Sequence, residues 1–101
     1  MANLHAEYMT DAEVRNIALP ILEKRFGRFG FQDVSVKEEE DFDGAYVFRM
    51  TARVQEKVPA RELIDTLDDI HTALRKKGEF RFVYLSTERP GADDADEDDV
   101  E

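Results

Sequence analysis

The sequence contains no cysteine and no long apolar run. Without cysteine the chain can form no disulfide bond and no zinc–thiolate site, and thiolate catalysis is excluded. No segment approaches the ~20 consecutive apolar residues that a transmembrane helix needs. The first residues also lack the apolar stretch of a secretion signal. These absences favour a soluble protein in a reducing compartment, and we predict a cytoplasmic location.

Motifs of common enzyme sites are missing as well. The sequence has no nucleophile elbow, no glycine-rich phosphate loop and no paired-histidine metal motif. We therefore predict that the protein is not an enzyme and that it uses no metal or other cofactor.

The charge of the chain is strongly negative and unevenly placed. The 101 residues have a formal net charge of −10, and residues 93–101 hold seven carboxylates and no base. The rest of the chain therefore carries only three net negative charges. A block of like charge this dense repels itself, so we predict a disordered acidic tail over residues 89–101. Its carboxylates could attract a basic partner, and the candidates for such contacts are Asp93, Asp94, Asp96 and Glu97.

Residues 45–54 show the clearest secondary-structure pattern in the chain. Apolar and polar side chains alternate here, which is typical of a strand with one buried face. The apolar set is Tyr46, Phe48, Met50, Ala52 and Val54. The other face carries Val47, Arg49, Thr51 and Arg53. We predict that the first set faces the core.

A helix is predicted before this strand. Thr10 and Glu13 have the spacing of a capping box, in which each side chain accepts a hydrogen bond from the other residue's backbone N–H. An apolar stripe follows at helical spacing as far as Phe26. Pro20 interrupts the stripe, and we expect it to kink or split the helix. Gly27 or Gly30 can supply a left-handed end.

Three further elements complete the predicted fold. Residues 31–40 read as a strand, and Asp43-Gly44 is a strong hairpin signal between this strand and the next. A second helix is expected from Pro59, in its first turn, to Gly78. Residues 80–86 read as a third strand that is apolar on both faces. Such a strand is either central in its sheet or part of an oligomer interface.

The order α-β-β-α-β predicts an α+β fold. We expect a two-layer sandwich in which two helices cover one face of a three-stranded sheet. Residues 1–9 would form an N-terminal arm, residues 10–88 the single domain, and residues 89–101 the tail. Three strands with one uncovered face make a thin sheet, so we predict a homodimer formed through open faces or edges.

Two clusters invite a metal or acid–base interpretation. Glu39, Asp41, Asp43 and Gly44 match the first half of a calcium loop, but Met50 stands where the loop needs glutamate. The hairpin turn accounts for the same residues. Asp68 and His71 share a face of the second helix, so a carboxylate could hold the imidazole, but we favour a solvated helix face as the explanation.

Arginines on two strands suggest a second kind of surface. Arg49 and Arg53, with Arg81 on the neighbouring strand, would form a basic patch on the open sheet face. Tyr84 or Phe82 beside them would resemble the stacking platform of an RNA-binding domain. The element order also resembles that of the N-terminal domain of ribosome maturation factor P and its KH-like relatives, although the G-x-x-G loop is absent. This resemblance implies an RNA- or ribosome-associated role.

The small size, the acidity and the lack of a catalytic constellation favour another function. We expect an interaction protein that binds a basic protein partner, in its sharpest form an antitoxin-like or immunity-like neutraliser. The alternative is the RNA- or ribosome-associated domain with its Arg49, Arg53 and Arg81 face, which the net negative charge disfavours.

Overall fold

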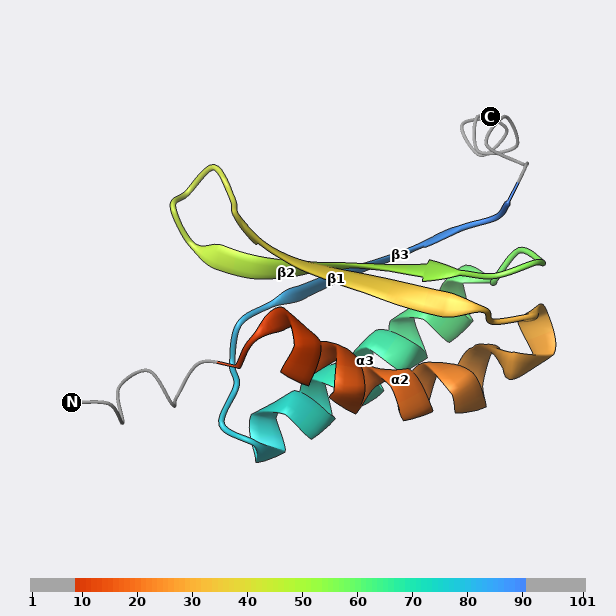
Figure 1. Cartoon of the computed structure of the whole chain (residues 1–101), viewed down its shortest axis with the longest axis horizontal. Helices are drawn as coiled ribbons and strands as arrows, with labels where there is room; N and C mark the ends of the chain where they lie inside the picture. The colour runs from red at the N-terminus through yellow and green to blue at the C-terminus, as the bar shows by residue number, and fades with distance from the viewer. Residues whose placement is uncertain (1–8, 91–101) are drawn as a thin grey trace.

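The computed structural model describes residues 9–90 as two layers, with a three-stranded sheet on one side and two helices on the other (Figure 1). This arrangement confirms the predicted α+β fold and its element order. The elements are α2 (Asp11–Phe26), the 3₁₀ turn η1 (Gly27–Phe29), β1 (Asp33–Glu40), β2 (Tyr46–Arg53), α3 (Ala60–Lys76) and β3 (Val83–Glu88). No helix in this part of the chain has the length and apolarity needed to cross a membrane.

The sheet has the order β1-β2-β3, so the alternating stretch predicted from the sequence is its central strand. β1 pairs antiparallel with β2, and β3 pairs parallel with β2 after the α3 crossover. β3 is therefore an edge strand, which rules out the central position considered for it. It also begins at Val83 rather than at Phe80, so residues 80–82, which were expected in the strand, precede it.

The helix α2 begins as its sequence predicts. The Thr10 hydroxyl accepts from the Glu13 N–H at 3.1 Å, and the Glu13 carboxylate accepts from the Thr10 N–H at 2.9 Å. The expected split at Pro20 is wrong, because α2 runs without interruption through this residue. A proline removes a single backbone hydrogen bond from the helix. The buried side chains on both sides of it pack into one core, and they are Val14, Ala18, Leu22 and Phe26.

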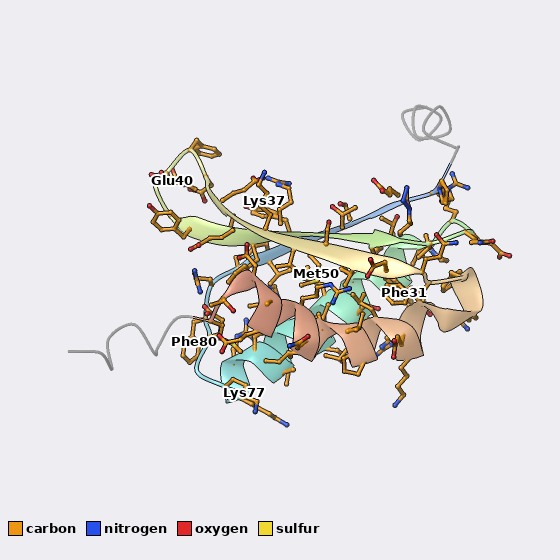
Figure 2. All side chains as sticks on the ribbon, viewed as in Figure 1. Phe31, Lys37, Glu40, Met50, Lys77 and Phe80 are labelled. Carbon is orange, nitrogen blue, oxygen red and sulfur yellow. The ribbon has the colours of Figure 1, made fainter. Side chains whose placement is uncertain are left out.

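The core lies between the helices and the inner face of the sheet. Phe48, Met50, Ala52 and Val54 are fully buried, which confirms the predicted inner face of β2. Figure 2 shows Met50 in this layer and Lys37 on the opposite, open face of the sheet. Tyr46 follows the same alternation but is 55% exposed. The aromatic stripe therefore emerges from the core at the hairpin end of β2.

The Asp41 side chain reinforces the backbone hydrogen bonds of the hairpin turn. The Asp41 carboxylate accepts from the backbone N–H groups of Asp43 and Ala45 at 2.9 and 3.0 Å. Gly44 has a φ of 86°, a left-handed conformation that glycine adopts without steric cost. The sequence prediction of an Asp-Gly hairpin is thus confirmed, and Asp41 is occupied by the turn.

Candidate protein-interaction surface

The tip of the β1–β2 hairpin exposes a phenylalanine among carboxylates. The Phe42 side chain is 97% exposed, although the turn requires only Asp41 and Gly44. Glu40 and Asp43 flank it in sequence and are also exposed. Within residues 9–90, neither of them nor Asp41 forms an ion pair with a lysine or arginine. The tip therefore presents an uncompensated acidic rim around an apolar ring.

More exposed aromatic side chains lie at the same end of the sheet. The register places Val83, the first residue of β3, beside Phe48, close to the start of β2. Phe80, which Figure 2 shows at this end of the molecule, is exposed, as are Phe82 and Tyr84. The rings of Phe82 and Tyr84 meet edge to face at 4.8 Å. We call the carboxylates and Phe42 of the hairpin tip, together with Tyr46, Phe80, Phe82 and Tyr84, the hairpin-end surface.

A buried ion pair underlies this surface. Glu79 is only 2% exposed and accepts from Arg81 Nη2 at 2.8 Å and from Arg81 Nε at 2.9 Å. The backbone N–H groups of Met9 and Arg81 also donate to it, each at 3.0 Å. Burial on its own would raise the pKa of Glu79. The hydrogen bonds from Arg81 and from the two backbone groups outweigh burial, and they lower the pKa to about 2.

The same arginine connects three parts of the chain. Arg81 Nη2 donates to the Met9 carbonyl at 2.9 Å, and Nη1 donates to Glu38 of β1 at 2.5 Å. Its guanidinium lies over the ring of Phe48 at 4.3 Å from the ring centre. These contacts fix the segment that leads into β3 against both of the other strands. The geometry of the hairpin-end surface therefore depends on the pair of Glu79 and Arg81.

These contacts correct the predicted basic patch. Arg49 and Arg53 do lie on the open face, but Arg81 lies on the helix-covered side, where Phe48 and Val83 are buried. Arg81 precedes β3, and its contacts with Glu79, the Met9 carbonyl and the Phe48 ring hold it on this side. The three arginines therefore form no common surface.

The two arginines of the open face also have acidic neighbours. Arg49 Nε contacts Glu39 at 2.9 Å, and its guanidinium stacks over Tyr84 at 5.5 Å from the ring centre. Arg53 faces Glu88 at 3.6 Å. These partners come from both neighbouring strands, as the sheet register dictates. Positive and negative side chains therefore lie next to each other on this face, and it is not a basic platform.

The predicted acid–base pair has a structural use in the fold. The His71 Nε2 atom accepts a hydrogen bond from the Val83 N–H at 2.9 Å, at the start of β3. Burial lowers the pKa of His71 and Arg75 lowers it further, while Asp68 acts in the opposite direction. The imidazole is therefore held neutral with its proton on Nδ1.

No group of three histidine, aspartate or glutamate side chains in the described region could hold a metal ion. The half calcium loop at the hairpin is occupied by the turn itself, since Asp41 already accepts two backbone hydrogen bonds. The tail candidates Asp93, Asp94, Asp96 and Glu97 lie outside the described residues.

Sequence reasoning missed the ion pair of Glu79 and Arg81. Nothing in the short connection after Gly78 marks this glutamate as buried. The residue that closes over it, Met9, is 70 positions away in the chain. The exposure of Phe42 was also missed, although a phenylalanine inside an Asp-Gly turn is a detectable signal, because turn positions are solvent-exposed.

Comparison of the chain with protein-family models, with curated proteins and with solved structures gave no match in any of the three.

Proposed function

We propose that the chain is a non-enzymatic interaction protein that binds a basic protein partner through its hairpin-end surface. The observation that carries this proposal is the almost fully exposed ring of Phe42 within an acidic rim. A side chain of this size stabilises a complex by roughly 1.5–3 kcal/mol when it is buried. Its position at a hairpin tip lets it enter a pocket of another protein.

The carboxylates around Phe42 support a basic rather than an acidic partner. Negative charge that has no ion-pair partner among residues 9–90 attracts cations over a distance and raises the rate of association. The half-exposed rings of Phe82 and Tyr84 extend the apolar area behind the tip. An antitoxin-like or immunity-like neutraliser of a basic toxin is the most specific form of this proposal.

The alternative function, RNA binding, has weaker support. Stacking of Arg49 on Tyr84 would suit a nucleic-acid platform. However, Arg49 and Arg53 each face a carboxylate, and Arg81 is on the other side of the sheet. Phosphate binding needs a surplus of positive charge, which this face does not supply.

A capture experiment at low ionic strength tests the proposal. The immobilised full chain is compared with Phe42→Ala and with the double variant Glu40→Gln/Asp43→Asn, and retained molecules are identified by mass spectrometry. We expect a basic protein to bind the wild type and to bind Phe42→Ala roughly 30-fold more weakly, as for a hot-spot residue. The double variant should mainly slow association.

The control variant Glu23→Gln/Glu56→Gln removes two exposed charges elsewhere and should bind like the wild type. All variants should keep the wild-type melting temperature, because Phe42 packs against no core residue and the four substituted carboxylates are exposed. Retention of RNA alone, or of a protein that binds Phe42→Ala as tightly as the wild type, would refute the proposal.

A further inference from the structure

The outer edge of β3 has backbone groups that no other element in the described part of the chain pairs. Phe48 N–H donates to the Phe82 carbonyl and Val54 N–H donates to the Glu88 carbonyl, so the even-numbered residues of β3 face β2. Alternate residues of a strand direct their backbone groups to opposite sides. Val83, Leu85 and Thr87 therefore face outward. His71 accepts from the Val83 N–H, but no described residue bonds the backbone of Leu85 or Thr87 on this side.

The opposite edge of the sheet is protected. On β1, Arg15 Nε donates to the Val34 carbonyl at 2.9 Å, and the Asp33 carboxylate accepts from the Val34 N–H at 2.8 Å. The strand also ends in charged residues 37–40. Charged side chains on an edge strand oppose pairing with another chain. Residues 83–87 of β3 carry no charge, and the charged last residue of the strand, Glu88, faces Arg53 of β2.

An exposed apolar side chain lies along the open edge. Ile64 precedes His71 by seven residues, which is two helical turns, so both share one side of α3. His71 contacts the outer edge of β3, and Ile64 is 66% exposed on the same side. The edge therefore combines unpaired backbone groups with apolar surface from the helix layer.

We propose that a second copy of this chain pairs antiparallel along β3, so that two three-stranded sheets join into one of six strands. The segment Val83–Thr87 is self-complementary about Leu85. Leu85 would face Leu85 of the second copy and Tyr84 would face Ser86, while Val83 would meet Thr87 through its carbonyl alone, because its N–H is held by His71. No charge opposes a like charge within these pairs.

Tyr84 belongs both to the hairpin-end surface and to this edge, but the residues tested here, Leu85 and Thr87, lie outside that surface, so this proposal can fail without the proposed function. It also specifies which residues meet. Residue 85 would lie opposite its own copy, with about 5.5 Å between the two Cα atoms, as in a hydrogen-bonded antiparallel pair. Disulfides form readily at Cα separations of about 4.4–6.8 Å.

The absence of cysteine from the chain makes this geometry testable. The variant Leu85→Cys is compared with the matched control Ser35→Cys. Ser35 is exposed on the other edge strand, and it pairs with Thr51 from the opposite side to Ser86. We expect Leu85→Cys to form a disulfide-linked dimer roughly tenfold faster or more, since pairing raises the effective thiol concentration. Equal rates for the two variants would overturn the proposal.

Light scattering across a concentration series provides a second readout. The wild type should reach twice the 11.7 kDa mass of the chain. Thr87→Pro removes one outward N–H without touching the bonds to β2, so it should keep a cooperative melt and remain a single chain. A wild type that stays a single chain at every concentration, or a dimer that survives Thr87→Pro, would equally refute β3 pairing.

Discussion

Replacement of Glu79 by glutamine is expected to destabilise the fold more than any exposed charge substitution. The change keeps the shape of the side chain but removes the charge that neutralises Arg81, whose side chain is only 13% exposed. The pKa of Glu79 is lowered from 4.5 to about 2. Each pKa unit corresponds to about 1.4 kcal/mol, so the ionised carboxylate contributes about 3 kcal/mol to the free energy of unfolding. Loss of one partner from a buried pair typically costs about 3–5 kcal/mol.

The matched control is Glu38→Gln. Glu38 contacts the same guanidinium at 2.5 Å, but its side chain is 42% exposed. An ion pair of that kind contributes about 0–1 kcal/mol. Urea denaturation at pH 7, with linear extrapolation to water, measures both variants on one scale. The expected result is a loss of about 3 kcal/mol for Glu79→Gln and of less than about 1 kcal/mol for Glu38→Gln.

The dependence on pH gives an independent check. Because the pKa of Glu79 is lower in the folded chain, its contribution is complete above 4.5 and is lost as the pH falls from 4.5 towards 2. The stability difference between wild type and Glu79→Gln should therefore shrink over this interval. Equal losses for the two glutamate variants, or a difference that stays constant between pH 5 and pH 2, would refute the reasoning.

Three further predictions concern other parts of the fold. Burial lowers the pKa of His71 in the folded chain. On acidification the unfolded chain therefore binds the proton first, so the free energy of unfolding should fall as the pH drops below 6.5. Urea melts of His71→Gln should lack this loss. The Thr66 hydroxyl is buried without a hydrogen-bond partner among the described residues, so Thr66→Val should raise the free energy of unfolding by about 1 kcal/mol in the same assay. Gly30 has a φ of 78°, and an added Cβ would lie 2.7 Å from Gln55 Cβ. Gly30→Ala should therefore lower the free energy of unfolding by about 2 kcal/mol in thermal melts. Gly27→Ala, with open space around the added Cβ, should be neutral or stabilising in the same assay.

The elements that the sequence predicted well are those fixed by short-range interactions. The capping box of Thr10 and Glu13 needs four consecutive residues, and the Asp-Gly turn needs little more. The alternation of β2 is visible because one face is buried over its length. The start of β3 was placed too early because Phe80 and Phe82 suit a strand in composition. Their neighbour Arg81 is instead held by Glu79 and Met9 before the strand begins.

The open face of the sheet and the ion pair beneath the hairpin-end surface were only partly predictable, because long-range register places their charges. Arg49 and Arg53 were correctly assigned to the open face by alternation. Their carboxylate neighbours follow only when the pairing of all three strands is known. The burial of Glu79 depends on a residue 70 positions away, which no local pattern reveals.

The two connections within the sheet differ greatly in length, and this difference bears on how the chain folds. β1 and β2 are joined by a tight turn, whereas β2 and β3 are separated by residues 54–82, which include the whole of α3. Closing the longer loop costs more conformational entropy and requires the crossover helix to be in place. We therefore expect the hairpin to assemble early and β3 to dock late. Until it does, one edge of the central strand is unprotected, which makes this stage of folding the one most exposed to aggregation.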